Sequence, residues 1–249
     1  MESGQDIQRN LDESLAILNN VGDSSGIVVF PEYQVYVPDF RGRVPEVPES
    51  LITEKFGPLS RGRHLYVNYP EPSGGEKPYN TSVIIHDGQI ISRYRKIHLY
   101  DAGKSRESDF YAPGNTLPGN TNISGQNASM QICYDIRFPE ACRNLRLSGA
   151  RIITYQAGWF AGSGKLAQWQ SLVRARAIEN GCYVIAAAQC GERFTGHSMV
   201  VNPYGEVIEE MNNEPGILEV DIDTDLLGKY DADYPLMQQR NPASDQIDH

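Results

Sequence analysis

SMQICYDIRFPE, residues 129–140, is the stretch from which the fold is read most directly. Its first half is a short run typical of a β-strand, and its second half passes through a proline into the start of a helix. Cys133 stands where the strand gives way to the turn. A thiol in this position lies near a helix N-terminus and the amide of Tyr134. That placement predicts a lowered thiol pKa and a binding place for a negative oxygen.

Two other predicted strands also end at an ionisable side chain. GIVVFPEY, residues 26–33, is a β-branched run followed by proline and Glu32, and burial behind those apolar residues predicts a raised carboxyl pKa. A hairpin with an Asp-Gly turn is predicted over residues 81–96, and strand alternation directs Lys96 inward. A carboxylate, an ammonium and a thiol are the groups needed for covalent hydrolysis of an acyl compound.

The motifs around these residues strongly resemble those of the nitrilase superfamily of carbon–nitrogen hydrolases, and most of all its amidase branch, which contains the omega-amidases. The matching segments occur in the family's order and cover nearly the whole chain. They are FPEY (30–33), YRKIHLYD (94–101), RESDFYAPG (106–114), ICYDIRFPE (132–140), RARAIENGCYVIAAAQCGE (174–192) and GHSMVVNPYGEVI (196–208).

This resemblance implies a role for each ionisable side chain. Cys133 would be the nucleophile, Glu32 the proton-transfer group, and Lys96 the cation that holds an oxyanion together with the amide of Tyr134. Glu107 resembles the family's second active-site glutamate, which orients the lysine. The ordinary alternatives are that Cys133 is a buried structural thiol and that Glu107 is an exposed loop carboxylate.

Several other residues receive weaker predictions. Arg137 and Glu140 are expected to pair near the start of their helix. The side chains expected to contact substrate are aromatic, although aromatic residues in a core more often serve packing: Tyr33, Tyr134 and Trp159. The remaining cysteines and two histidines near the motifs are expected to be structural: Cys142, Cys182, Cys190, His98 and His197.

Hydrophobic periodicity predicts strands that alternate with helices in part and with hairpins elsewhere. The main helices are expected over residues 6–20, 137–147 and 166–180, a long loop over 101–122, and the last strand over 217–223. The residues alone indicate a layered α/β domain. The family resemblance implies a four-layer α-β-β-α sandwich that occupies residues 1–249 as a single domain.

Composition narrows the class of protein. With 249 residues, 40% of them hydrophobic, the chain can bury a large core, and its net charge of −10 argues against nucleic-acid or membrane-surface partners. No bilayer-length apolar run and no signal-peptide pattern is present. The four cysteines form no C-x-x-C pair, which favours a reduced, cytoplasmic setting. No pattern indicates a metal, nucleotide or other cofactor.

The beginning of the chain departs from the family pattern. Family members usually open with a strand of the form K-I-A-x-x-Q-x, whereas this chain starts at Met1 and reaches its first helix almost at once. The usual first strand is therefore expected to be lacking. Its loss should expose backbone groups and apolar surface in the sheet.

The expected function is hydrolysis of a small, carboxylate-bearing amide by a homodimer or higher homo-oligomer. An N-carbamoyl amide hydrolase and a nitrilase are the alternatives within the superfamily. The alternative that is not an enzyme is a non-catalytic scaffold with the same fold. The expected lack of the first strand favours it.

Overall fold

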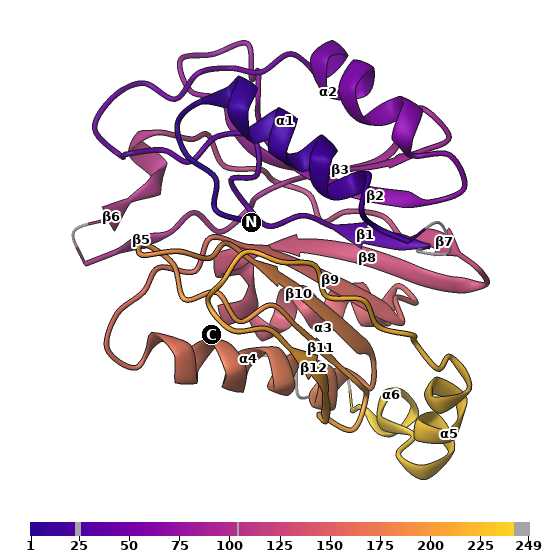
Figure 1. Ribbon diagram of the computed structural model, residues 1–249. Helices are drawn as coiled ribbons and strands as arrows, with labels where there is room; N and C mark the ends of the chain where they lie inside the picture. Colours follow the sequence, from indigo (N-terminus) through magenta and orange to yellow (C-terminus); the bar gives the residue numbers. More distant parts are fainter. Residues whose placement is uncertain (23–25, 104, 242–249) are drawn as a thin grey trace.

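The computed structural model describes residues 1–22, 26–103 and 105–241. Two β-sheets pack face to face (Figure 1). Within these residues the first sheet consists, in spatial order, of β1 (Ile27–Val29), β2 (His64–Glu71), β3 (Tyr79–His86) and β4 (Gln89–Arg95). The second consists of β12 (Val207–Glu210), β11 (Met199–Val201), β10 (Tyr183–Ala188), β9 (Ile152–Ala157), β8 (Gln126–Ile132) and β7 (Thr121–Ile123).

Helices cover the outer face of each sheet, which completes the predicted four layers (Figure 1). The first sheet carries α1 (Ile7–Leu18) and α2 (Glu49–Phe56), and the second carries α3 (Pro139–Leu147) and α4 (Lys165–Asn180). Two short helices, α5 (Asp225–Asp233) and α6 (Leu236–Gln239), follow at the C-terminal end. No helix in the described part of the chain is long and apolar enough to cross a bilayer.

The strand directions bring several strand ends to one edge of the sandwich. β1 runs parallel to β2, and β4 points the same way because β2, β3 and β4 are successively antiparallel. In the second sheet β8 runs parallel to β9. The Gln156 amide at the end of β9 donates to the carbonyl oxygens of Phe30 (2.7 Å) and Tyr66 (3.3 Å), which ties the two sheets together beside the end of β1.

The segment after β4, predicted as a loop, contains short elements. β5 (Asp101–Ala102) pairs with β6 (Ser105–Arg106), and the one-turn 3-10 helix η2 (Glu107–Asp109) follows directly. A second 3-10 helix, η3 (Cys133–Arg137), joins β8 to α3, and a third, η1 (Gly57–Leu59), follows α2. The loop thereby gains enough structure to hold Glu107 in a fixed place.

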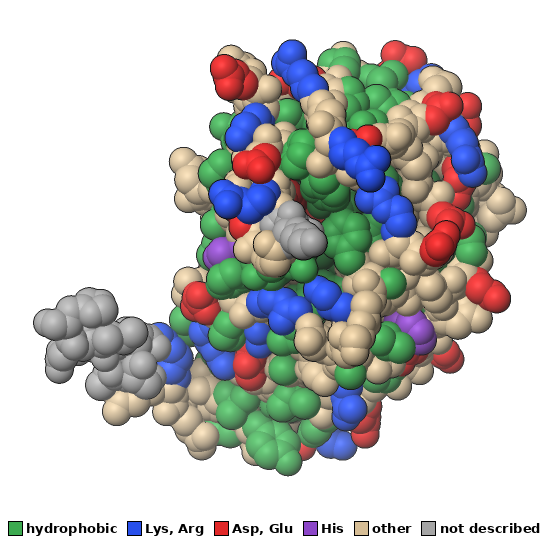
Figure 2. Space-filling view, turned by 90° about the vertical axis from the view of Figure 1, so that its left-hand side faces the viewer, with side chains coloured by type: hydrophobic (Ala, Val, Ile, Leu, Met, Phe, Trp, Pro, Cys, Tyr) green, Lys and Arg blue, Asp and Glu red, His purple; other side chains and the backbone are tan. Residues whose placement is uncertain are grey.

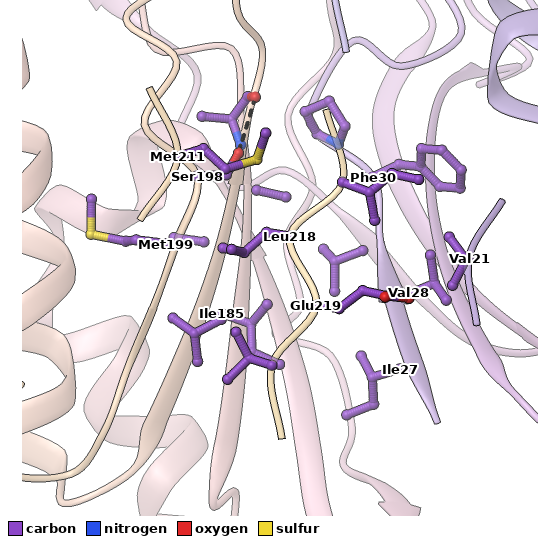
Figure 3. A pocket seen from close by; sticks show the side chains of 18 of the residues that line it. Val21, Ile27, Val28, Phe30, Ile185, Ser198, Met199, Met211, Leu218 and Glu219 are labelled. Atoms are coloured by element: carbon purple, nitrogen blue, oxygen red, sulfur yellow. Dashed lines mark hydrogen bonds between the residues drawn. The ribbon is translucent and has the colours of Figure 1, made fainter. Parts of the chain in front are cut away.

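The predicted last strand over residues 217–223 is wrong. These residues form no regular secondary structure and belong to no sheet in the structure. The reason is the lack of a neighbour: a strand forms only where a second edge offers hydrogen bonds. The segment lies across a gap from β1, and in Figure 3 Leu218 and Glu219 stand between the side chains of β1 and those of the second sheet.

This gap is a cavity of about 650 Å³ between the free edge of β1 and residues 217–222. The carbonyl of Gly26 and the amide of Phe30 bond to β2, so the backbone groups of Ile27 and Val29 point the other way, into the cavity. No strand precedes α1 in the described residues 1–22. None of the predicted catalytic side chains lines this cavity.

Candidate active site

The turn after β8 holds Cys133 in an unusual backbone conformation. Its φ is +45°, in the left-handed region that costs a residue with a side chain about 1–2 kcal/mol. The side chain of Asp135 stabilises the turn by accepting the amide hydrogen of Ile132 at 2.9 Å. The Cys133 residue as a whole is 7% exposed. The predicted position of Cys133, at a strand end and the first turn of a helical segment, is confirmed.

Lys96 lies directly after β4 and joins two buried carboxylates. Its Nζ donates to Oε1 of Glu32 at 2.7 Å and to Oε2 of Glu107 at 2.8 Å. All three side chains are at most 1% exposed. The structure therefore brings together residues from the end of β1, the end of β4 and η2. An exposed loop position for Glu107 is excluded.

Further groups that the sequence did not single out hold the two carboxylates. The amide of Asn80 donates to Glu32 at 2.9 Å and to Glu107 at 3.0 Å, and so bridges them. The backbone amide of Gly158 donates to Glu32 at 2.7 Å, and that of Tyr100 donates to Glu107 at 2.6 Å. An asparagine at the start of a strand and a glycine after one carry no sequence signal for this role.

Burial and neighbouring charges shift the pKa values of the cluster. Burial raises the pKa of Glu32, as predicted, and the Glu107 charge raises it further against the opposing effect of Lys96. Burial alone would lower the pKa of Lys96, but the charges of Glu107 and Glu32 outweigh it and raise this pKa well above its usual value. The result is a stable ammonium between two carboxyl groups.

The prediction of a lowered thiol pKa is wrong. Burial raises the pKa of Cys133 well above its usual value, the negative charge of Glu32 adds to the effect, and Lys96 only partly offsets it. The effects of burial, neighbouring charges and a helix N-terminus on a thiol pKa add together, and here burial and the carboxylate outweigh the rest. Cys133 therefore rests as a neutral thiol. The carboxylate of Glu32 lies within hydrogen-bond reach of this thiol.

The aromatic residues predicted to contact substrate surround this cluster. Tyr33 packs so closely against Gly158 that a Cβ on that glycine would lie 2.5 Å from its ring. Its hydroxyl donates to Glu107 at 3.2 Å, so Tyr33 forms a wall behind the carboxylates. Trp159 is buried and Tyr134 is half-buried. Their contact with substrate remains a prediction.

The predicted pairing of Arg137 with Glu140 is wrong. The Arg137 guanidinium donates to Oε1 of Gln168 at 2.6 Å and lies over the rings of Trp159, at 4.8 Å, and Tyr134, at 5.9 Å. The 3-10 turn after Cys133 points Arg137 toward α4 and away from its own helix start. The side chain is thereby placed beside the residue that follows the thiol.

Lys165 is a second cation that lies against Trp159. Its Nζ lies 5.0 Å from the ring centre of Tyr100 and 5.3 Å from that of Trp159, and it donates to the Tyr100 hydroxyl at 3.2 Å. Figure 2 shows Lys and Arg side chains around a hollow with hydrophobic side chains on the face toward β5 and β6. Among the described residues no group of three or more His, Cys, Asp and Glu side chains is arranged to hold a metal ion.

Comparison with known proteins identifies the family. The description of the carbon-nitrogen hydrolase family matches residues 3–232. The deaminated glutathione amidase of Mus musculus is 40% identical over 178 residues, which are 67% of this chain and 55% of the mouse protein. The protein of that name from Synechocystis sp. PCC 6803 is 32% identical over 260 residues, covering 96% of this chain and 95% of the relative.

Solved structures agree with this assignment. A mutant amidase from Nesterenkonia sp. AN1, with the acetamide moiety of fluoroacetamide added covalently at its active site cysteine, superposes with a TM-score of 0.82 at 25% identity. The match covers 98% of this chain and 93% of that amidase. This chain spans only about half the length of the mouse relative. Both the sequence and the four-layer fold show that the chain belongs to the carbon-nitrogen hydrolase family.

Proposed function

We propose that this protein hydrolyses the C–N bond of a small amide through a thioester on Cys133. Glu32 takes the thiol proton as the sulfur bonds to the carbonyl carbon, and the carbonyl π electrons move onto oxygen. Lys96 and the amide of Tyr134 hold that oxyanion. When the oxyanion collapses, the C–N bond breaks, Glu32 returns the proton to nitrogen, and ammonia leaves.

Water completes the cycle. Glu32 accepts a proton from water as the oxygen attacks the thioester carbon. The C–S bond then breaks, and Glu32 returns the proton to the sulfur of Cys133 while the carboxylic acid leaves. One carboxylate can serve as base, acid and base again only if its pKa lies close to the working pH, and burial moves the pKa of Glu32 in that direction.

The observation that carries the proposal is the buried cluster of Cys133, Glu32, Lys96 and Glu107. Buried ionised groups are expensive in free energy, and a hydrophobic set of the same volume usually stabilises a fold at least as well. Such a cluster around a cysteine that is slightly exposed as a residue is typical of an active site. It also argues against the non-catalytic scaffold.

The substrate that fits the surroundings of Cys133 bears a carboxylate. Arg137 and Lys165 lie against the rings of Trp159 and bond to neutral groups rather than to carboxylates of the described residues. Two cations that meet no carboxylate within the described ranges, in a chain of net charge −10, suit an anionic ligand. Two relatives are named deaminated glutathione amidase, and this supports an amide substrate here.

Mass spectrometry after brief incubation with glutaramate, succinamate, N-carbamoyl-β-alanine or a matching nitrile tests the proposal, with ammonia assayed in parallel. The expected result is an acyl mass on the Cys133 peptide and ammonia from an omega-amide. Cys133→Ala should abolish both, whereas Cys190→Ala, which changes another buried thiol, should retain both. Turnover by Cys133→Ala would refute the mechanism, and preference for the carbamoyl compound or the nitrile would select those alternatives.

The setting and assembly are part of this proposal. All four cysteines are unpaired in the structure, which suits a reducing cytoplasm. We also propose a homodimer or higher homo-oligomer, supported by large exposed apolar side chains at Leu147, Ile178 and Tyr234. Light scattering on the purified chain tests this, and a monomeric mass at micromolar concentration would contradict it.

A further inference from the structure

Asp135 is a buried carboxylate that the proposed chemistry does not use. It is fully buried and accepts hydrogen bonds from two segments of the chain. Oδ2 accepts from the backbone amide of Ile132 at 2.9 Å and from the hydroxyl of Tyr94 at 2.7 Å. Oδ1 accepts from the backbone amide of His98 at 3.3 Å and bonds its ring Nδ1 at 2.7 Å.

Asp135 and its partners are close sequence neighbours of Lys96 and Cys133, whose ammonium and thiol act together in the proposed reaction. Tyr94 and His98 lie two residues before and two residues after Lys96. Asp135 lies two residues after Cys133 and braces the turn in which Cys133 has its positive φ. The bonds of Asp135 therefore connect the strand end that carries the ammonium to the turn that carries the thiol.

The two side chains on Asp135 are themselves held in place. Burial, reinforced by the charge of Asp135, raises the pKa of Tyr94 well above its usual value, so its hydroxyl stays protonated and donates. The ring of His98 stacks on that of Phe138, with ring centres 3.7 Å apart and planes inclined by 8°. Phe138 directly follows η3, so the stacking is a second contact, besides the bond to Asp135, that holds His98 against the Cys133 turn.

We infer that Asp135, Tyr94 and His98 form a positioning cluster that sets the thiol of Cys133 relative to the ammonium of Lys96. The inference rests on the proposed function. Neither Tyr94 nor His98 hydrogen-bonds the thiol, Lys96 Nζ or the carboxylates of the site, so their effect passes through the backbone of the two segments. A small displacement of reacting groups slows the chemical step without weakening substrate binding.

Tyr94→Phe tests the inference, because it leaves the ring in place but removes the bond to Asp135 and the weaker bond that the hydroxyl accepts from the Ile97 amide at 3.3 Å. The matched control is Tyr66→Phe, at a fully buried tyrosine whose hydroxyl has no hydrogen-bond partner among the described residues. Loss of one bond to a charged group should lower kcat of Tyr94→Phe roughly tenfold with KM unchanged. Tyr66→Phe should retain the wild-type kcat.

The histidine provides a rescue test. Asparagine at position 98 places an amide N–H close to where the ring Nδ1 stands, whereas leucine offers no donor. We expect His98→Asn to retain most of the wild-type kcat and His98→Leu to lose it by about the same factor as Tyr94→Phe. Equal losses in the two His98 variants would overturn the role assigned to the His98–Asp135 bond.

Alkylation of Cys133 by iodoacetamide separates this inference from the proposed function, because it needs no amide substrate. Of the four cysteine residues Cys133 is the most exposed, and mass spectrometry follows the alkylation rate of its peptide separately from the others. Tyr94→Phe should change that rate severalfold and Tyr66→Phe should not. Equal alkylation rates and equal kcat in these two variants would overturn the inference. A rate difference in a chain that hydrolyses no amide would support the positioning cluster and refute only the hydrolase proposal.

Discussion

Replacement of Lys96 by methionine tests the electrostatics of the buried cluster. Methionine keeps the volume of the side chain but removes the ammonium that joins Glu32 at 2.7 Å and Glu107 at 2.8 Å. Removing one partner of a buried ion pair costs about 3–5 kcal/mol of folding free energy. In a domain of this size each kcal/mol lowers Tm by about 2–4 °C, so we expect a loss of roughly 6–20 °C.

The loss should depend on pH. Lys96 lowers the pKa of Glu32 in the folded wild type, so its removal moves that pKa further above the unfolded value. A carboxyl group with a raised folded pKa stabilises the protein below the unfolded pKa, and this contribution is lost as pH rises through the folded pKa. The Tm difference between Lys96→Met and the wild type should therefore be smaller near about pH 5 than near about pH 8.

Circular dichroism melting at the two pH values measures both effects. Lys55→Met is the control, because Lys55 lies 3.8 Å from the exposed carboxylate of Glu54 and such surface pairs contribute at most about 1 kcal/mol. If Lys96→Met melts like Lys55→Met, or if its deficit grows toward acid pH, the account of the buried cluster is refuted.

Three other changes test separate parts of the structure. Glu107→Gln removes a charge that raises the pKa of Glu32, so the acid limb of kcat/KM against pH should move to lower pH; an upward shift would contradict this. Gly158→Ala forces a Cβ to 2.5 Å from a tyrosine ring and should lower kcat by up to about 100-fold in steady-state kinetics, whereas full activity would contradict this close approach. Val28→Pro removes an N–H that pairs with β2, whereas Val29→Pro removes an N–H that faces the cavity, so Val28→Pro should lower Tm more. Equal losses would mean that the cavity-facing edge of β1 is also hydrogen-bonded.

The sequence predicted the central elements of the fold because their signals are local. The hairpin of β3 and β4 turns at Asp87 and Gly88, both with positive φ, as an Asp-Gly pair between β-branched runs indicates. The helix α4 ends before Gly181, also in the left-handed conformation. The strand predicted over residues 217–223 failed because β pairing depends on a partner that the segment itself does not specify.

The same division applies to the candidate site. Glu32, Lys96, Cys133 and Glu107 could be predicted because each stands in a motif long enough to be recognised. Asn80 and Gly158 could not, because their role depends on two carboxylates that reach them from other elements. Arg137 was assigned to the wrong partner for a similar reason, since the turn at Cys133 decides which helix its side chain meets.

The sequence by itself determined which strands end in a carboxylate, an ammonium and a thiol, because residue order and periodicity fix what each segment presents. Only the tertiary structure decided the electrostatic state of those groups. The thiol pKa of Cys133 is raised instead of lowered because packing of the two sheets removes water and brings up the charge of Glu32, which Lys96 only partly offsets. Desolvation and distance between segments remote in sequence are properties of the folded chain, and no local pattern contains them.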